Sequence, residues 1–212
     1  GMLPPIRYPR RMWAGGELHI SNIFQPEDVV NKTSMVTDIQ NKSGSKGKLC
    51  FVTIIHEFCV QNKKFLTEIQ RLVFKEDIKE NEDKPQWQKK AAKIAESSEK
   101  KAIINTDPVL LFRYSALTFN GHRIHYDVNH ARKVEGQPGI VVHGPLQASW
   151  LLNMAARHLG VVPSRLIYKN LSPLFAGQVA CLSVAEKYDG KGLIVYCCDE
   201  SGNITMKGEA FI

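Results

Sequence analysis

The stretch HGPLQASWLLNMAARHLG, residues 143–160, predicts a long helix that is buried on most of its sides. Pro145 suits the first position of a helix, and Gly160 suits the residue that ends it. The residues between them are largely apolar throughout, and a helix that they form would span about 22 Å. A helix of this kind needs other elements around it, so it decides how the rest of the chain is arranged.

Segments rich in Val, Ile, Thr and Phe lie both before and after this helix. Turn-like sequences such as NKSGSKGK and YDGKG separate neighbouring segments, which predicts antiparallel meanders and not β-α-β units. A long buried helix wrapped by an antiparallel sheet is the hotdog architecture, and the predicted fold class is α+β. The expected strands are residues 17–24, 29–40, 49–60, 65–74, 165–171, 178–187, 193–198 and 204–212.

The two sets of strands form a weak internal repeat, because FQPEDV and FAGQV introduce the second strand of each set. The repeat predicts a double hotdog, with an N-terminal repeat at residues 1–75 that lacks its helix and a C-terminal repeat at residues 108–212 that has it. Residues 1–15 are predicted to be an extended arm. The charged residues 76–107 are predicted to be a linker with a short exposed helix around residues 87–102.

This arrangement leaves one apolar face of the N-terminal sheet uncovered, and an exposed apolar face favours aggregation. The short helix of the linker, the other repeat or a second chain must cover it. A homodimer is therefore one of three expectations. Either this repeat has lost its own helix or the sequence begins after that helix.

The densest group of reactive side chains lies in residues 111–127, LFRYSALTFNGHRIHYD. Apolar residues at its start recur at helical spacing and predict a short helix that leads into the group. Asp127 suits the N-cap of a second short helix at residues 128–134. Gly121 allows a tight bend between the two helices. The polar side chains around this bend are Asn120, His122, Arg123, His125, Tyr126 and Asp127.

Three segments, FNGHRIHYD, HGPLQASWLL and SRLIYKNLSPLFAGQ, resemble the MaoC-like dehydratases and hydratases and occur in that family's order. The nearest branch contains the mitochondrial 3-hydroxyacyl-thioester dehydratases and the mesaconyl-CoA and itaconyl-CoA hydratases. RYPRRMWAGG, residues 7–16, is similar to the first repeat of this branch. The resemblance implies a double hotdog that reversibly dehydrates a (3R)-3-hydroxyacyl thioester to the trans-2-enoyl thioester, as in fatty-acid synthesis, without a cofactor or a metal.

The resemblance assigns His125 as the catalytic histidine, and a histidine can remove a proton next to a thioester because its pKa lies near neutrality. Asn120 stands where most of the family has aspartate; an amide cannot act as a base but can orient water or the hydroxyl group. His122 replaces the family's usual asparagine, and catalytic, supporting and structural roles stay open for it. Gly144 matches the oxyanion-hole glycine, because its N–H at a helix start could stabilise an enolate.

Cationic and aromatic side chains are further candidates for binding the substrate. Arginine suits phosphate and carboxylate groups, and the tryptophan and glycines of RYPRRMWAGG match the substrate-side segment of the branch. His143 is expected either beside the substrate or in support of the helix start. The candidates are Arg10, Arg11, Trp13, Gly15, Gly16, Arg123 and His143.

The net charge of +7, from 28 basic and 21 acidic residues, favours an anionic partner. With the resemblance, the expected partners are acyl-CoA or an acyl carrier protein, and neither nucleic acid nor a membrane; a surplus of solvated lysine is the alternative. The five cysteines are expected to be buried, reduced thiols of a soluble intracellular protein. The family's eukaryotic members imply mitochondria, and the cytoplasm is expected otherwise.

Three competing functions fit parts of the sequence. The first is the same chemistry on a short dicarboxylic CoA ester, as in mesaconyl-CoA or itaconyl-CoA hydratase. A buried arginine aimed into the pocket would favour it, whereas an apolar tunnel would favour fatty chains. A hotdog thioesterase would share the fold, but the hydratase motif argues against it. A non-catalytic acyl-thioester binding module agrees with Asn120 and with the positive charge.

Overall fold

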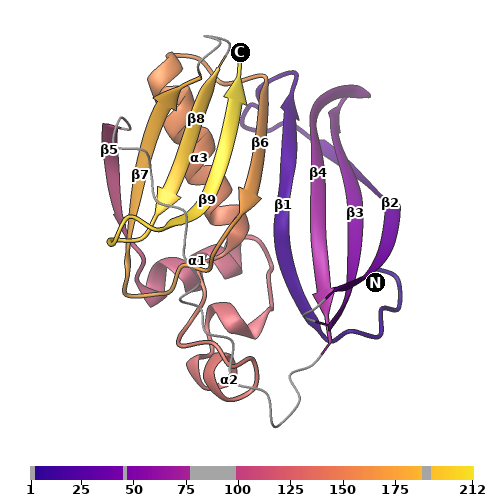
Figure 1. Ribbon diagram of the computed structural model, residues 1–212. Helices are drawn as coiled ribbons and strands as arrows, with labels where there is room; N and C mark the ends of the chain where they lie inside the picture. The colour runs from indigo at the N-terminus through magenta and orange to yellow at the C-terminus, as the bar shows by residue number, and fades with distance from the viewer. Residues whose placement is uncertain (1–2, 45–46, 77–98, 188–191) are drawn as a thin grey trace.

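The computed structural model describes residues 3–44, 47–76, 99–187 and 192–212. In these residues nine strands form one antiparallel sheet, in the order β2-β3-β4-β1-β6-β9-β8-β7-β5 (Figure 1). The strands are β1 (Arg10–Ile20), β2 (Val30–Gly44), β3 (Gly47–Val60), β4 (Lys63–Lys75), β5 (Glu99–Asn105), β6 (Arg165–Asn170), β7 (Val179–Glu186), β8 (Leu193–Cys198) and β9 (Ile204–Phe211). The helices are α1 (Pro108–Leu117), the 3-10 turn η1 (Arg123–His125), α2 (Val128–Lys133) and α3 (Gly144–Leu159).

The sheet consists of two halves with the same internal order. The N-terminal half is β2-β3-β4-β1, and the C-terminal half repeats this order as β7-β8-β9-β6, with β5 added at its outer edge. The halves meet where β1 pairs with β6, from Gly15 opposite Lys169 to His19 opposite Arg165. This repetition confirms the predicted double hotdog.

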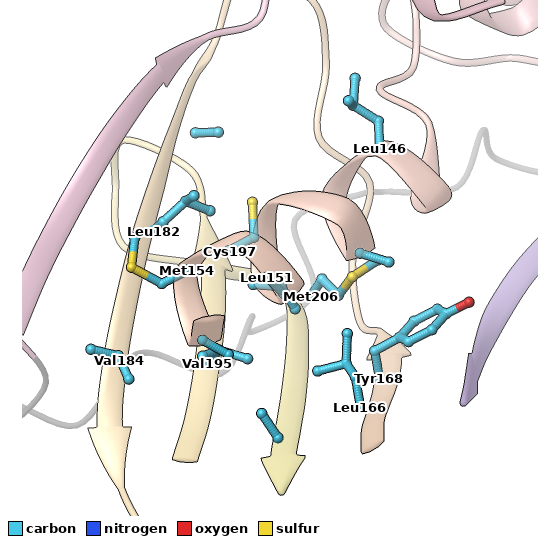
Figure 2. Close-up of a cluster of buried hydrophobic side chains, with 14 of the residues drawn as sticks. Leu146, Leu151, Met154, Leu166, Tyr168, Leu182, Val184, Val195, Cys197 and Met206 are labelled. Carbon is cyan, nitrogen blue, oxygen red and sulfur yellow. The ribbon is translucent and has the colours of Figure 1, made fainter. Parts of the chain in front are cut away.

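Helix α3 fills the concave side of the C-terminal half, behind β7, β8 and β9 in Figure 1. Pro145 lies in its first turn, and Gly160 ends it in a left-handed conformation with φ of 70°. Leu151 and Ala155 are fully buried, and Figure 2 shows the surrounding core. A Cβ at Gly208 of β9 would lie 3.2 Å from Leu151, so the absence of a side chain there lets the helix approach the sheet.

The N-terminal half has no helix of its own: the described residues before Pro108 contain none. Part of its concave face is covered by the arm at the start of the chain instead. Leu3, Ile6 and Tyr8 pack against a buried cluster on β3 and β4. The rest of this face stays open toward the C-terminal half. The cluster consists of Cys50, Val52, Ile54, Leu72 and Phe74.

Two predictions of secondary structure were wrong. Strand β1 begins at Arg10 and not at residue 17, because its first residues pair with the end of β4, where Arg10 lies opposite Lys75. The last part of the expected helix at residues 87–102 is strand β5, which pairs with β7. Pairing with a distant strand here outweighs the helical preference of the local sequence. The rest of the expected helix, residues 87–98, lies outside the described residues.

The short helices α1 and α2 lie at one end of the sheet (Figure 1) and hold the reactive segment between them. Asp107 caps α1 by accepting a hydrogen bond from Leu110 N at 2.8 Å. Asp127 caps α2 by accepting one from His130 N at 2.9 Å, which confirms its predicted role. Such caps typically stabilise a helix by about 1 kcal/mol.

None of the helices in the described ranges has the length and the hydrophobicity that crossing a membrane requires.

Candidate active site

A cavity of about 2050 Å³ lies between the two halves. One wall comes from β1, β3 and β4 of the N-terminal half. The other comes from the segments 118–125 and 141–149 of the C-terminal half, which contain the reactive cluster and the start of α3. The two segments that the sequence singled out therefore meet at one cavity.

The bend after α1 presents Asn120, His122 and His125 to this cavity. Phe119 has a positive φ of 51°, a tight conformation that is uncommon outside glycine. The backbone N–H of Asn120 then bonds back to Ser115 O at 2.9 Å. The hydroxyl of Tyr126 donates to Gly121 O at 3.0 Å and closes the bend. These bonds fix the direction in which the following residues leave α1.

His125 has the geometry of a base. Its ring is 8% exposed and lines the cavity, and Nδ1 lies 2.8 Å from the carbonyl oxygen of Val141. A carbonyl only accepts hydrogen bonds, so Nδ1 carries the proton of the neutral ring and Nε2 is left with a free lone pair. Burial and the charges of His122 and Arg11 lower the pKa of His125 to about 4, against the effect of the Val141 bond.

His143 lies directly behind His125. The two rings stack with centroids 3.7 Å apart, and His143 Nε2 is 2.8 Å from the hydroxyl of Ser115. Burial, followed by the charges of His125 and His122, lowers its pKa to about 3. His143 is fully buried and does not line the cavity. Of its two expected roles, this position fits support of the helix start and not contact with the substrate.

His122 and Asn120 flank His125 on the side of the cavity. The His122 ring meets that of His125 edge to face at 5.5 Å, and burial together with Arg11 lowers its pKa. The side-chain oxygen of Asn120 accepts a hydrogen bond from His122 N at 3.1 Å. Both residues line the cavity, so the residues predicted to carry the chemistry are brought together.

Gly144 begins α3 and lines the same cavity. The N-cap residue His143 makes no side-chain bond to the first turn, and within the described chain Gly144 N–H has no hydrogen-bond partner. A Cβ at this position would lie 2.8 Å from Asn170 Nδ2 and 3.5 Å from Trp13. The helix start thus packs closely against β1 and β6, with an unpaired donor at its positive end.

The arginine candidates lie in different places. Arg11 is exposed and lines the cavity. Arg10 also lines it, but its guanidinium bonds to Glu135 Oε2 at 3.3 Å and to Glu135 O at 2.9 Å. Arg123 pairs with Asp127 at 2.7 Å on the surface and does not line the cavity. Arg11 is therefore the best placed of the three to meet an anionic substrate.

Trp13 lines the cavity beside the helix start, whereas Gly15 and Gly16 do not line it. A Cβ at Gly15 would lie 2.4 Å from Tyr168 O, and one at Gly16 would lie 2.5 Å from Ile69 O. Neither position has room for a side chain, because β1 is pressed between β4 and β6. The two glycines thus allow the halves to join.

The cavity also contains polar residues that sequence reasoning missed. His56, Glu68 and Gln70 face it from β3 and β4 of the N-terminal half. Glu68 and Gln70 occupy alternate positions of a strand, on the face that also carries buried Leu72. The sequence did contain a signal for these residues, because polar side chains occupy the inward-facing positions of an amphipathic strand.

No group of three or more His, Cys, Asp or Glu in the described ranges is arranged to hold a metal ion. The five cysteines are free thiols, and four of them are buried. Burial raises the pKa of Cys197 and of Cys198 to about 12, which suppresses the reactive thiolate form.

Comparison with known proteins gives a family. Residues 1–176 match the family profile of hydroxyacyl-thioester dehydratase type 2. A Chloroflexus aurantiacus protein named mesaconyl-C(4)-CoA hydratase is 36% identical over 178 residues, which cover 82% of this chain and 61% of that protein. A Schizosaccharomyces pombe protein named mitochondrial hydroxyacyl-thioester dehydratase type 2 is 25% identical over 209 residues, covering 86% and 67%. The chain thus spans about two thirds of the length of these relatives.

Solved structures show the same fold. HtdX from Mycobacterium tuberculosis has a TM-score of 0.73 at 19% identity, covering 95% of this chain and 76% of that chain. A MaoC-like dehydratase from Phytophthora capsici has a TM-score of 0.69 at 14% identity, covering 95% and 72%. A further M. tuberculosis protein, described as a double hotdog, has a TM-score of 0.61 at 14% identity, covering 96% and 74%. Since the family profile covers most of its residues, the chain belongs to the hydroxyacyl-thioester dehydratase type 2 family.

Proposed function

We propose that the chain catalyses the reversible dehydration of a (3R)-3-hydroxyacyl thioester to the trans-2-enoyl thioester. The observation that carries this proposal is the pairing of His125 and Gly144 in one cavity. His125 offers an unprotonated Nε2, and Gly144 offers an unpaired N–H at a helix start. Elimination next to a thioester needs both, because the proton removal creates an enolate that must be stabilised.

In the proposed mechanism, the thioester carbonyl oxygen accepts a hydrogen bond from Gly144 N–H. Nε2 of His125 removes the proton from C2, and negative charge develops on the carbonyl oxygen at the positive end of α3. The C3–O bond then breaks while the protonated His125 returns the proton to the departing hydroxyl. Water and the enoyl thioester are released, and His125 is neutral again. Hydration is the same sequence in reverse.

Asn120 would act by orientation. Its side-chain oxygen is engaged by His122 N, so its amide N–H groups are the part that can donate to the hydroxyl or to water. The reaction is redox-neutral and uses only proton transfers, so the proposal includes no cofactor and no metal. Arg11 at the cavity wall would meet the phosphates of coenzyme A or of an acyl carrier protein.

The test is hydration of crotonyl-CoA by the wild type, His125→Ala and the control His158→Gln, which changes an exposed histidine at the far end of α3. Loss of a general base lowers kcat by about 10²- to 10⁴-fold, so His125→Ala should lose this factor and His158→Gln should lose nothing. Equal activity of wild type and His125→Ala would refute the mechanism. No hydration by the wild type would favour a binding module, and release of free CoA thiol would indicate a thioesterase.

A second candidate substrate is a short dicarboxylic acyl-CoA. The relative named mesaconyl-C(4)-CoA hydratase supports it, as do the polar residues on the N-terminal wall of the cavity. The compartment and the assembly are likewise proposals. The relative named mitochondrial supports a mitochondrial location if the source is eukaryotic. For any other source we propose the cytoplasm. A homodimer is a further proposal, and sedimentation of the purified protein tests it.

A further inference from the structure

Four polar side chains, Ser34, His56, Glu68 and Gln70, line up on the concave face of the N-terminal half, and we call them the polar row. Ser34 lies opposite His56 in the pairing of β2 with β3, and His56 lies opposite Glu68 in the pairing of β3 with β4. Residues directly opposite in a sheet point from the same face. Gln70 lies two residues after Glu68 and shares that face. Three adjacent strands therefore contribute to one polar strip.

Contacts hold the row in place. The hydroxyl of Ser34 lies 2.7 Å from His56 Nδ1, and the side chain of Gln70 lies beside the same ring. His56 is only 5% exposed. Burial, followed by the charge of Lys32, lowers the pKa of His56, so its ring is neutral at pH 7. Because His56 is buried and hydrogen-bonded, its ring has a fixed position at the cavity wall, unlike a solvated surface side chain.

Glu68 is the one member of the row whose side chain has no hydrogen bond or ion pair within the described chain. Its carboxyl lines the cavity, and burial raises its pKa, with Lys32 opposing that shift. A carboxyl group accepts hydrogen bonds through its oxygen atoms, and it also donates one when it is protonated. Glu68 is thus available to a group that enters the cavity.

The row faces the proposed catalytic residues across the cavity. Glu68 lines the same cavity as Tyr114 and Tyr168. Tyr114 packs edge-on against His143 at 4.8 Å, and His143 stacks on His125. An acyl group whose thioester carbonyl is held at Gly144 would extend toward this wall. Gly144 and three residues of the row, His56, Glu68 and Gln70, line this one cavity, so an acyl group that extends across it ends against the row.

We propose, resting on the proposed function, that the polar row binds an oxygen-bearing group at the far end of the acyl chain, a carboxylate or a hydroxyl, with Glu68 as the residue that sets specificity. A hydrocarbon end would bury Glu68 without a partner, which disfavours it by about ten- to hundredfold. Lys32 adds a positive charge beside the row, which favours the carboxylate over the hydroxyl.

The experiment compares kcat/KM for four enoyl-CoA substrates that share the reacting double bond. Crotonyl-CoA ends in a methyl group, 4-hydroxycrotonyl-CoA in a hydroxyl, fumaryl-CoA in a carboxylate, and trans-2-octenoyl-CoA in a longer alkyl chain. The variants are Glu68→Gln, which keeps a hydrogen-bonding group, and Glu68→Leu, which removes it. The control is Glu57→Leu, since Glu57 lies on the opposite face of β3 and pairs with Lys64.

The expected result is a preference of the wild type for fumaryl-CoA or 4-hydroxycrotonyl-CoA over crotonyl-CoA by about ten- to hundredfold. Glu68→Leu should abolish this preference, by lowering kcat/KM for the oxygen-bearing substrates and not that for crotonyl-CoA. Glu68→Gln should keep part of the preference, and Glu57→Leu should match the wild type. Preference of the wild type for octenoyl-CoA, or an equal loss on all substrates in Glu68→Leu, would overturn the inference.

The two proposals fail differently. If crotonyl-CoA is hydrated but no oxygen-bearing substrate is preferred, only the role of the polar row is refuted. If the wild type hydrates none of the four substrates, the proposed function is refuted. Calorimetric binding of the saturated analogues succinyl-CoA and butyryl-CoA then decides the role of the row by itself: tighter binding of succinyl-CoA that is lost in Glu68→Leu supports it, and equal binding overturns it.

Discussion

The imidazole rings of His125 and His143 lie stacked, with centroids 3.7 Å apart and planes inclined by 16°. Both rings are buried, and each is held at one nitrogen, His125 by Val141 O and His143 by the hydroxyl of Ser115. Two positive charges at this separation repel strongly, so protonation of one ring opposes protonation of the other. Burial keeps His125 neutral, and the stack together with the bond to Val141 O fixes the direction of its free Nε2.

This stack should make the protein sensitive to acid. Burial, followed by the charges of His122 and Arg11, lowers the pKa of His125 to about 4. Burial, followed by the charges of His125 and His122, lowers the pKa of His143 to about 3. Unfolded histidines titrate near pH 6.5, so the unfolded state binds more protons as the pH falls below that value. The free energy of unfolding should be constant above pH 6.5 and fall between pH 6.5 and 4, by up to about 1.4 kcal/mol per pH unit for each ring. Urea unfolding at several pH values measures it.

His143→Phe is the matched variant, because it keeps an aromatic ring behind His125 and removes one titrating group. It should be about 1–2 kcal/mol less stable at pH 7, since Ser115 loses its partner. Its stability should then depend less on pH between 6.5 and 4 than that of the wild type. The same slope in both proteins would show that His143 titrates normally.

Asn120 should contribute by position and not as a base. Asn120→Ala removes the oxygen that accepts from His122 N and the amide proposed to orient the hydroxyl, so kcat should fall by about 10- to 100-fold. Asn120→Asp keeps the acceptor and adds a negative charge near His125. That charge favours the imidazolium and should move the acidic limb of the kcat/KM profile to higher pH. If kcat and the pH dependence of kcat/KM were unchanged in both variants, Asn120 would have no role in the reaction.

Gly144→Ala should damage both stability and activity. Its Cβ would lie 2.8 Å from Asn170 Nδ2 and 3.5 Å from Trp13, which must shift the helix start at a cost of about 1–3 kcal/mol. Gly139→Ala is the control, because a Cβ at Gly139 meets nothing within 4 Å, and its effect should stay within about 0.5 kcal/mol. Thermal unfolding and crotonyl-CoA hydration measure the two losses. Equal behaviour of both variants would contradict the tight packing.

Glu17 should stabilise the junction between the halves. Its carboxylate pairs with Arg71 of β4 at 2.5 Å and with Arg165 of β6 at 2.7 Å. Burial opposes its ionisation, but these bonds and charges outweigh burial and lower the pKa of Glu17 to about 2. The stabilisation should be complete above pH 4.5 and be lost as the pH falls toward 2.

Glu17→Gln should therefore lower the free energy of unfolding at pH 7 by about 1–3 kcal/mol, between the values for exposed and buried ion pairs. Glu57→Gln, which removes an exposed pair with Lys64, should cost at most about 1 kcal/mol. Denaturant titration compares them. A loss in Glu17→Gln no larger than in Glu57→Gln would mean that the junction does not depend on this network.

Much of the fold could be predicted because its signals are local. Pro145 and Gly160 marked the ends of α3, and Asp127 marked the start of α2, since caps act on residues within one turn. Strand β5 was missed for the opposite reason. Residues 99–105 form a strand through pairing with β7, about 80 residues later in the chain, and helical preference within the segment says nothing about that partner.

The sequence by itself determined the buried helix, the alternating strands and the segment that carries Asn120, His122 and His125, because each depends on neighbours a few residues away. Only the tertiary structure decided that His143 lies behind His125 and not at the cavity wall, and that β3 and β4 turn polar side chains into the cavity. Those facts follow from strand register and from packing between the halves. Both depend on contacts between residues far apart in the chain, which local preferences do not encode.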